Sequence, residues 1–214
     1  MALFALDKDI NFPPVHLAEP DGLLAIGGDL SEARLLKAYA MGIFPWFEGD
    51  TPLWWSPNPR FVLFPTELQV SKSMRQLLKR KEFRFSINQD FEQVISNCKT
   101  TFRKDQAGTW ITEEVRKAYI SLHHAGHAHS AEVWSGDELV GGCYGIRMGN
   151  VFFGESMFSK VSNASKFAFI SYVEQLIREE VQLIDCQVYT SHLESLGARM
   201  IDRSDFIRLL EENI

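Results

Sequence analysis

The chain has 214 residues, which is enough for one full hydrophobic core or for a core domain with a small domain attached. Its composition, 45% hydrophobic and 23% charged, excludes a disordered or fibrous chain. The formal net charge of -6 at pH 7 argues against a protein that coats nucleic acids without specificity, because such binding depends on lysine and arginine residues that neutralise phosphates.

The sequence also carries signals for the compartment in which the protein works. Its first residues lack the basic start, apolar run and cleavage site of a secretory signal, and no window approaches the roughly 18 apolar residues of a membrane helix. The three cysteines, Cys98, Cys143 and Cys186, are widely spaced and form no Cys-x-x-Cys pair. We therefore expect a soluble cytoplasmic protein with free thiols.

The front of the chain, residues 1–65, is predicted to be a small N-terminal domain. It contains all eight prolines, which is typical of short elements joined by fixed turns. Asp29 or Ser31 can accept hydrogen bonds from the first-turn amides of a helix, and Gly42 can supply a left-handed stop. The pattern therefore predicts a helix over residues 31–41.

Residues 66–214 form a more regular body. The elements predicted there are, in chain order, helices over 72–81, 90–97 and 112–124, strands over 131–134, 139–146 and 151–153, a long helix over 162–180, a strand over 183–188, and two helical segments from Ser191 and Ser204. The turn Met148-Gly149-Asn150 predicts a hairpin between two of these strands. We expect an antiparallel sheet beside a long helix, and thus a mixed α/β (α+β) fold.

Several segments of the sequence together carry a family resemblance. They are Gly22-Leu-Leu-Ala-Ile-Gly-Gly-Asp-Leu, Gly42-Ile-Phe-Pro-Trp-Phe, Leu53-Trp-Trp-Ser-Pro-Asn-Pro-Arg60, Gly108-Thr-Trp-Ile-Thr112, Gly126-His-Ala-His-Ser130, Gly154-Glu-Ser-Met-Phe-Ser159 and Leu183-Ile-Asp-Cys-Gln-Val188. In this order, from about Asn11 to Asp205, they resemble the leucyl/phenylalanyl-tRNA-protein transferase family. The resemblance implies that residues 66–214 have the acyltransferase fold of the GNAT superfamily, in which a splayed sheet carries the acyl donor and a long helix packs behind it.

The resemblance also implies a reaction. The α-amino group of a protein that begins with Arg or Lys attacks the ester carbonyl of leucyl- or phenylalanyl-tRNA, which tags that protein for degradation through the N-degron pathway. An α-amino group with a pKa near 7.7 to 8.0 is partly neutral at pH 7, and positioning can supply much of the acceleration. We expect no cofactor and no metal, and we expect the protein to act as a monomer.

Three polar residues are the catalytic candidates that the resemblance implies, namely Asp185, Gln187 and Glu155. Asp185 and Gln187 are two apart on a predicted strand, so their side chains are expected on one face, where the carboxylate would orient the amide. Because a neutral amide is a very weak base, Gln187 is interpreted first as a group that positions the amine. Glu155, expected at the end of a strand, would pair with the acceptor's cationic side chain or amine. Without the resemblance, polar residues satisfied by neighbouring backbone would be the simpler interpretation.

The resemblance further implies a mainly apolar pocket for the donor amino acid. Its residues are Tyr39, Trp46, Trp110, Tyr119, Cys143, Phe152, Ser156, Phe169, Tyr172 and Ile184. Such a pocket discriminates poorly between apolar side chains of similar size, so Met is expected as a donor beside Leu and Phe. Trp46 and Trp110 are also candidates for stacking on the terminal adenine of the tRNA. Taken one by one, these residues are equally well explained as core.

A basic cluster is the candidate contact for the tRNA phosphates. It consists of Lys72, Arg75, Lys79, Arg80, Lys81 and Arg84. The alternative is a solvated helix face with no partner.

Two other functions compete with amino acid transfer. A coenzyme A-dependent N-acyltransferase would share the fold, but residues 159–166, before the long helix, contain no glycine with which to bind a pyrophosphate. A tRNA-binding module without catalysis would need only the basic cluster.

His123 and His127 have helical spacing, but Gly126 interrupts the helix, which argues against a zinc site. Cys186 is a candidate nucleophile only by its position beside Asp185, and a buried strand thiol is the favoured interpretation.

Overall fold

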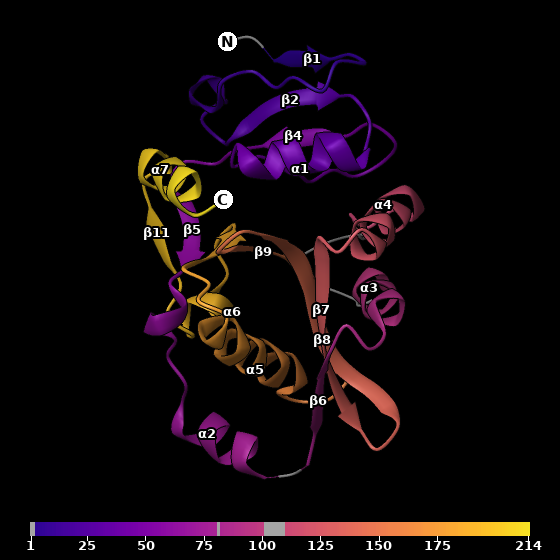
Figure 1. Cartoon of the computed structure of the whole chain (residues 1–214), viewed down its shortest axis with the longest axis vertical. Helices are drawn as coiled ribbons and strands as arrows, with labels where there is room; N and C mark the ends of the chain where they lie inside the picture. The colour runs from indigo at the N-terminus through magenta and orange to yellow at the C-terminus, as the bar shows by residue number, and fades with distance from the viewer. Residues whose placement is uncertain (1–2, 81, 101–109) are drawn as a thin grey trace.

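The computed structural model describes residues 3–80, 82–100 and 110–214, and it has the expected mixed α/β fold, with two sheets (Figure 1). The smaller sheet has four strands in the order β1, β2, β4, β3, and the larger has seven in the order β11, β5, β10, β9, β8, β7, β6. The chain builds the smaller sheet first, and the smaller sheet lies at one end of the molecule.

The smaller sheet consists of short strands from the proline-rich front. Its members are β1 (Phe4–Leu6), β2 (Leu23–Gly27), β3 (Phe44–Pro45) and β4 (Leu53–Trp55), with the 3-10 helix η1 (Val15–Leu17) between β1 and β2. Strand β1 is parallel to β2, whereas β4 is antiparallel to both β2 and β3. Trp54 is fully buried and donates its indole N–H to the carbonyl oxygen of Gly27 at 2.8 Å.

Helix α1 (Glu32–Ala40) packs on this sheet and confirms the helix predicted over 31–41. Gly42 follows it with a φ of +73°, the left-handed stop that was expected. The N-terminal cap differs from the prediction, because Ser31 occupies the cap position without a side-chain capping bond. Asp29 accepts instead from the backbone N–H of Ser31 at 2.9 Å.

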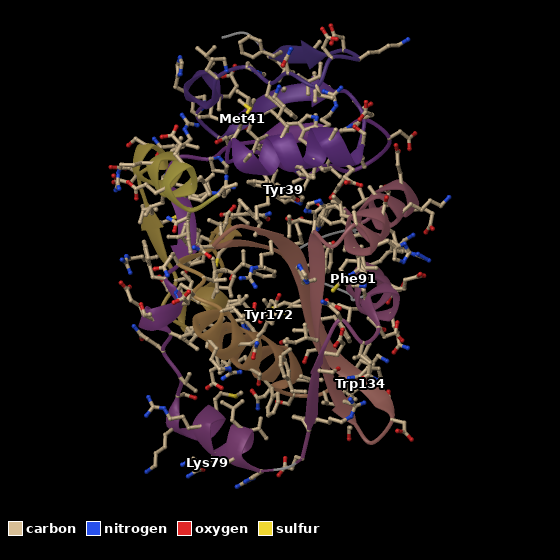
Figure 2. The ribbon with its side chains drawn as sticks, viewed as in Figure 1. Tyr39, Met41, Lys79, Phe91, Trp134 and Tyr172 are labelled. Carbon is tan, nitrogen blue, oxygen red and sulfur yellow. The ribbon has the colours of Figure 1, made fainter. Side chains whose placement is uncertain are left out.

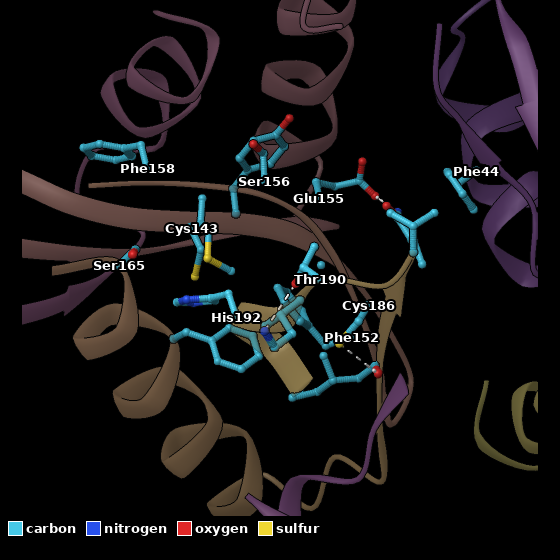
Figure 3. Close-up of a pocket in the computed structure, with 18 of the residues that line it drawn as sticks. Phe44, Cys143, Phe152, Glu155, Ser156, Phe158, Ser165, Cys186, Thr190 and His192 are labelled. Atoms are coloured by element: carbon cyan, nitrogen blue, oxygen red, sulfur yellow. Dashed lines mark hydrogen bonds between the residues drawn. The ribbon is translucent and has the colours of Figure 1, made fainter. Parts of the chain in front are cut away.

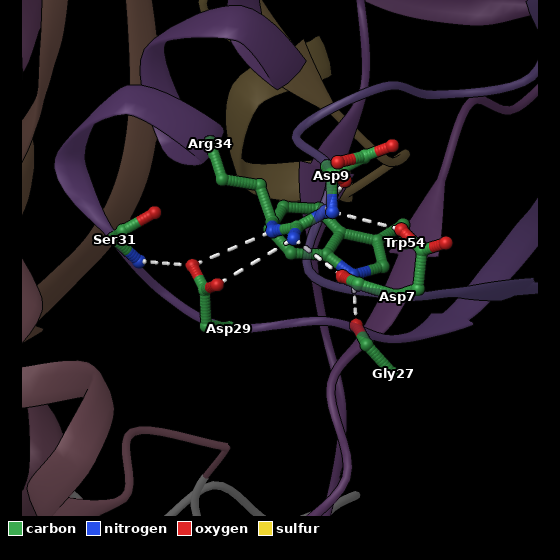
Figure 4. Close-up of polar contacts among 7 residues, drawn as sticks. All are labelled: Asp7, Asp9, Gly27, Asp29, Ser31, Arg34 and Trp54. Carbon is green, nitrogen blue, oxygen red and sulfur yellow. Dashed lines mark hydrogen bonds and ion pairs between the residues drawn. The ribbon is translucent and has the colours of Figure 1, made fainter.

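A buried arginine ties α1 to the start of the chain. Arg34 is 0% exposed and donates from Nη2 to the carbonyl oxygen of Asp7 at 2.8 Å and from Nη1 to that of Asp9 at 3.1 Å (Figure 4). It also pairs with the carboxylate of Asp29 at 3.4 Å. The guanidinium charge is therefore paired within the unit that the smaller sheet forms with α1.

The larger sheet contains all four strands predicted for the body and three short strands that were not predicted. Its members are β5 (Arg60–Leu63), β6 (Arg84–Ile87), β7 (Ala128–Ser135), β8 (Glu138–Met148), β9 (Val151–Ser159), β10 (Leu183–Gln187) and β11 (Arg199–Ile201). The predicted hairpin at Met148-Gly149-Asn150 joins β8 to β9. Because β5 pairs with β10, a division of the chain by sheets falls just before Arg60. The division into residues 1–65 and 66–214 stays a prediction about folding units.

Helices cover both faces of the larger sheet. They are α2 (Lys72–Lys79), α3 (Phe91–Thr100), α4 (Glu113–His124), α5 (Ala164–Arg178), α6 (Ser191–Glu194) and α7 (Arg203–Asn213), with a 3-10 helix, η2 (Pro65–Glu67), after β5. In Figure 1, α5 lies on one face, with α2 and α6 on the same side, and α3 and α4 lie on the other. All six helical segments predicted for the body are therefore present, and Thr112 caps α4 as expected, accepting from the N–H of Val115 at 3.2 Å.

The sheet splays between β9 and β10, its one parallel pair of neighbouring strands in the described part of the chain. Residues 183–185 of β10 pair with residues 151–153 of β9. Beyond that point β9 continues to Ser159 and, among the described strands, pairs only with β8. Strands β9 and β10 therefore separate, and side chains of both strands can face the space between them.

One hydrophobic core joins the two sheets. Its buried residues include Tyr39 of α1, Tyr119 of α4, Phe153 of β9 and Phe206 of α7. Figure 2 shows Tyr39 at the junction, between α1 and the larger sheet, and Lys79 of α2 at the opposite end of the molecule. The front of the chain therefore contributes side chains to the region where β9 and β10 separate.

Candidate functional site

A cavity of about 790 Å³ lies where β9 and β10 separate. Its lining combines one carboxylate and a few polar groups with a larger number of apolar side chains from both sheets and from α5 and α6. Figure 3 shows Glu155 on the side of Phe44 and Cys143 with Ser165 on the opposite side. The cavity therefore has a charged end next to the smaller sheet and an apolar end next to α5.

Seven of the residues predicted for the donor pocket line this cavity. They are Trp46, Trp110, Cys143, Phe152, Ser156, Phe169 and Ile184. The other three do not line it, since Tyr39 and Tyr119 lie behind Glu155 and Tyr172 packs edge-on against Phe152 at 5.1 Å. Sequence reasoning did not single out Ser165, Thr190 or His192, which also line the cavity. Isolated polar residues at the start of a helix carry no pattern that would have found them.

Trp46 lies at the cavity with 37% of its surface exposed. Trp55 holds it from the smaller sheet, because the Trp55 indole N–H donates to the carbonyl oxygen of Trp46 at 2.6 Å and the two rings lie 5.8 Å apart. Trp110 is 7% exposed and meets Tyr119 edge-on at 6.4 Å. Both indoles are thus fixed in place with one part facing the cavity.

Glu155 does not end a strand, as the sequence had suggested, because β9 runs on to Ser159. It is the extra residue of a β-bulge: Tyr144 pairs with Ser156 and Gly145 with Gly154, which leaves Glu155 without an opposite residue. A bulge turns a side chain away from the regular alternation of a strand. Gly145 allows it, since a Cβ there would lie 2.1 Å from the carbonyl oxygen of Phe153.

The Glu155 carboxylate accepts three hydrogen bonds. Tyr39 donates to Oε1 at 2.7 Å, Tyr119 donates to Oε2 at 3.0 Å, and the Gln187 amide nitrogen donates to Oε1 at 2.9 Å. The hydroxyl oxygens of the two tyrosines also contact each other. Burial raises the pKa of Glu155 to about 7, although the three donors oppose that shift by favouring the ionised form. Burial and the Glu155 charge hold the pKa of both tyrosines well above the ordinary value, so they remain donors.

Gln187 reaches Glu155 because β10 also contains a bulge. Asp185 pairs with Val62 and Gln187 with Phe61, so Cys186 is an extra residue, and Gln187 has a left-handed φ of +63°. The regular alternation that would place Asp185 and Gln187 on one face is therefore lost. The predicted contact between the Asp185 carboxylate and the Gln187 amide is wrong, because Asp185 Oδ1 accepts from the backbone N–H of Gln187 at 2.9 Å and the amide turns to Glu155.

Arg60 is the partner of Asp185, and the candidate residues chosen from the sequence did not include it. Its Nε donates to Oδ1 at 2.8 Å and its Nη2 to Oδ2 at 2.7 Å, and both residues are 0% exposed. The guanidinium carbon lies 4.7 Å from the ring centre of Phe44 and 4.6 Å from that of Phe206. The signal was present, since Arg60 ends one of the segments that carry the family resemblance, but nothing in the sequence pairs it with a residue 125 positions away.

The thiols of Cys143 and Cys186, which line the cavity, contribute apolar surface to it. Burial raises the pKa of Cys143 and of Cys186 well above the usual range, which keeps both neutral. Cys98 is also buried. The expectation of free thiols is confirmed for Cys143 and Cys186, and Cys186 has the surroundings of a strand thiol rather than those of an activated nucleophile.

Comparison with known proteins identifies the family. The family model described as leucyl/phenylalanyl-tRNA protein transferase matches residues 62–211, and the model of its N-terminal domain matches residues 28–58. The leucyl/phenylalanyl-tRNA–protein transferase of Flavobacterium johnsoniae is 56% identical over 210 residues, which covers 98% of this chain and 99% of that protein. That of Syntrophus aciditrophicus is 54% identical over 217 residues and covers 100% of this chain and 90% of the relative. The chain belongs to the leucyl/phenylalanyl-tRNA protein transferase family.

Solved structures align more distantly. A GCN5-related N-acetyltransferase from Kribbella flavida aligns with a TM-score of 0.39 and 9% identity, over 78% of this chain and 59% of that chain. The structure of L-PGS from Bacillus licheniformis aligns with a TM-score of 0.43 and 12% identity, over 80% and 57% of the two chains.

The basic cluster of this transferase lies mainly on α2. Lys72, Arg75 and Lys79 are exposed on this helix, Arg80 is exposed directly after it, and Lys81 lies outside the described residues. Arg84 is on β6, where its guanidinium carbon lies 4.9 Å from the Trp134 ring centre. A smaller cavity of about 240 Å³ between α2 and the start of α5 is lined by Arg80 and Asn163, two residues before Ser165 of the main cavity.

Two further expectations concern metals and membranes. Among the residues that the structure describes, no group of three or more histidine, cysteine, aspartate or glutamate side chains is arranged to hold a metal ion. His123 is occupied otherwise, with Nδ1 at 2.8 Å from the carbonyl oxygen of Ala128 and its ring stacked on Phe91. Within those same residues, no helix has the length and apolar character needed to span a bilayer.

Proposed function

We propose that this transferase moves Leu or Phe, and also Met, from aminoacyl-tRNA to the α-amino group of proteins that begin with Arg or Lys, which tags them for N-degron degradation. The observation that carries the proposal is the pair formed by Glu155 and Gln187 at the charged end of a large apolar cavity, joined at 2.9 Å. We also propose that it acts as a monomer. Its tRNA donor implies action in the cytoplasm.

The donor occupies the cavity along its length. Its apolar side chain lies against Cys143, Phe152 and Phe169, where burial of apolar surface stabilises Leu, Phe or Met. Its terminal adenosine lies toward the smaller sheet, where Trp46 and Trp110 offer ring surfaces for stacking. Ligand pockets of about 300 to 1,000 Å³ are usual for small molecules, so a cavity of about 790 Å³ holds both parts of the aminoacyl end.

The amine of the acceptor is oriented by Gln187. Because the amide nitrogen of Gln187 donates to Glu155, its carbonyl oxygen is left to accept an N–H from the incoming α-amino group. The amine nitrogen attacks the ester carbonyl carbon, the bond from that carbon to the ribose oxygen breaks, and the proton lost by the amine ends on the released ribose hydroxyl. Gln187 acts by holding the amine in line with the ester rather than by removing a proton.

Glu155 supplies negative charge for a cationic acceptor. Among the residues that line the main cavity, it is the single carboxylate, and its ionised form attracts the ammonium of an incoming N-terminus or a side chain of Arg or Lys. Its two tyrosine partners hold it in one orientation. This arrangement supports selection of basic N-termini by charge.

The acceptor stem of the tRNA follows a basic path. Its phosphates contact Arg80 and the exposed lysines and arginines of α2. Contacts of lysine and arginine with phosphate give affinity without base specificity. Because the net charge of the whole chain is -6, this local basic path determines where on the molecule the tRNA binds.

The proposal is tested by following label from leucyl-tRNA and phenylalanyl-tRNA into peptides that begin with Arg, Lys or Ala, with acetyl-CoA as donor in a parallel reaction. Transfer from both tRNAs to the Arg and Lys peptides, and not to the Ala peptide, is expected. Acetylation without transfer from tRNA would establish a coenzyme A-dependent enzyme instead. Unchanged transfer by Gln187→Ala with unchanged tRNA affinity would contradict the role given to Gln187.

A further inference from the structure

The contacts of Asp185 change the assignment of roles in the site. Both of its carboxylate oxygens bind Arg60, and Oδ1 also accepts from the backbone N–H of Gln187. The Gln187 side chain points to Glu155 instead. Asp185 therefore acts on the main chain of Gln187 and does not polarise its amide.

The main chain of Gln187 needs such support. Its φ of +63° is the left-handed conformation, which is unfavourable for residues with a Cβ and which glycine or asparagine adopts far more readily. Two short-range hydrogen bonds hold the turn: the one from Gln187 N to Asp185, and one from Val188 N to the carbonyl oxygen of Cys186 at 2.7 Å. Without the Asp185 bond, the turn has less to oppose a return to extended backbone, which would swing the amide away from Glu155.

Arg60 fixes where the Asp185 carboxylate lies. Its guanidinium is held between the rings of Phe44 and Phe206, which come from the smaller sheet and from α7. Two parallel N–H to oxygen bonds set the plane of the carboxylate, a geometry that lysine cannot reproduce. A path of direct contacts thus runs from Arg60 through Asp185 to the backbone of Gln187.

We propose that Arg60 is a positioning residue for the transfer reaction, which holds Gln187 in its left-handed turn through Asp185 and so aims the Gln187 amide at Glu155 and the acceptor amine. This role rests on the proposed function, because it concerns the rate of that same transfer. It assigns to Arg60 a task at a distance from the reacting atoms, since its side chain does not line the cavity.

The first test compares Arg60→Lys with Arg34→Lys. Both replace an arginine that is 0% exposed and paired with an aspartate, but Arg34 lies in the smaller sheet's own unit, away from Gln187. At a temperature where both variants are folded, we expect the single-turnover rate with saturating aminoacyl-tRNA to fall roughly ten- to a hundredfold in Arg60→Lys, as small misplacements of a positioning group do. Arg34→Lys should retain the rate. Equal rates in both variants would overturn the proposal.

The second test combines Arg60→Lys with Gln187→Ala. If Arg60 acts through Gln187, the loss caused by Arg60→Lys shrinks to less than about twofold when Gln187 is already absent. A loss of the same factor in both backgrounds would mean that Arg60 acts on general stability, and the proposal would be wrong.

The third test needs no activity. Hydrogen exchange of the segment 183–188 reports on the Gln187 N–H, which we expect to exchange faster in Arg60→Lys and unchanged in Arg34→Lys. Unchanged exchange in Arg60→Lys would overturn the proposal even if the wild-type transfers Leu and Phe as expected. If Arg60→Lys exchanges faster but the wild-type protein transfers neither Leu nor Phe, the proposed function is refuted. The structural role of Arg60 then still stands.

If Arg60→Lys does not fold, the apolar pair Arg60→Met with Asp185→Leu replaces it. Removing both partners of a buried ion pair is often tolerated, whereas removing one is not. The double variant is expected to fold and still to transfer roughly ten- to a hundredfold more slowly, because the Gln187 N–H has lost its acceptor. Wild-type rates in a folded double variant would contradict the positioning role.

Discussion

Glu155 is half-buried and accepts hydrogen bonds from two tyrosines and a glutamine. Burial disfavours its charge and the three donors favour it, and the balance brings its pKa to about 7, near neutral pH. A fully ionised carboxylate can accept all three bonds, whereas a protonated one needs an acceptor for its own proton. The site is therefore sensitive to pH in the range where an α-amino group also titrates.

The first prediction concerns this pH dependence. Divided by the rate of Glu155→Gln, which cannot ionise, the wild-type single-turnover rate should rise as pH increases through about 7 and then level off. The division removes the titration of the acceptor amine, which both proteins share. A ratio that does not change with pH would show that the charge of Glu155 plays no part in transfer.

The same group affects stability with a defined sign. Its folded pKa of about 7 exceeds the ordinary 4.5, so between these values the native protein binds more protons than the unfolded chain. The free energy of unfolding should therefore fall as pH rises through that window, and less steeply in Glu155→Gln. Denaturant unfolding at several pH values measures the difference between the two slopes.

Cys143 sets the space at the apolar end of the cavity. It lines the cavity with 4% of its surface exposed, and burial keeps its thiol neutral. We predict that Cys143→Met lowers transfer of Phe more than transfer of Leu, by about tenfold, because a larger side chain shortens the pocket. Competition between the two tRNAs gives the ratio directly. Cys143→Ala, which adds no volume, serves as control, and the same ratio in both variants would place the donor side chain elsewhere.

At the scale of elements, two bulges decide the site. The one in β9 turns Glu155 toward the end of β10, and the one in β10 turns Gln187 toward Glu155. Bulges recur next to functional sites because they redirect a side chain without ending a strand. Gly145 lies directly opposite the β9 bulge, where there is no room for a Cβ.

Gly145→Ala is therefore predicted to be destabilising. The added Cβ would lie 2.1 Å from the carbonyl oxygen of Phe153 and 2.5 Å from the Phe152 ring, so backbone must shift, at a cost of about 1–3 kcal/mol in the free energy of unfolding. Gly154→Ala is the matched control, since its Cβ would have an ordinary contact of 3.5 Å with the carbonyl oxygen of Asp185. Equal stability of the two variants in denaturant unfolding would contradict this reading of the bulge.

Elements differ in how well the sequence predicts them. Helix α4 has a side-chain cap, α1 has a glycine stop, and the hairpin of β8 and β9 has a glycine turn. These signals lie within a few positions of each element, so local chemistry specifies them. Strands such as β5 (Arg60–Leu63) and β11 (Arg199–Ile201) are only four and three residues long. They become strands because a strand that is distant in the sequence offers a free edge. A window of a few residues contains no information about that distant strand.

The whole molecule brings the front of the chain, the larger sheet and α7 to one site. Phe44 and Phe206 hold Arg60, while Tyr39 reaches Glu155 across the shared core. The basic helix α2 lies at the far end of the molecule from the smaller sheet. A donor as long as a tRNA can contact both ends at once, with its aminoacyl end in the cavity.

We predict that Arg75→Gln with Lys79→Gln weakens tRNA binding and lowers its salt dependence. Each lost phosphate contact reduces the slope of log affinity against log salt by about 0.7 to 0.9, so the double variant should lose about 1.4 to 1.8. Binding of uncharged tRNA at several salt concentrations measures the slope. Arg178→Gln with Arg208→Gln removes two exposed charges from α5 and α7 and serves as control. Equal losses in both pairs would mean that net charge, and not α2, attracts the tRNA.

The amino-acid sequence by itself determined the family, the order of the main helices and strands, and seven residues of the donor pocket that line the cavity. These depend on local pattern and on segments that can be recognised along the chain. Only the tertiary structure decided the contacts that make the site. Glu155 and Gln187 are 32 residues apart and Arg60 and Asp185 are 125 apart, and both pairs form only after the sheet has assembled. The alternation of a strand predicted the wrong partner for Asp185, because a one-residue bulge and a left-handed turn, stabilised by distant side chains, reverse which way Gln187 points.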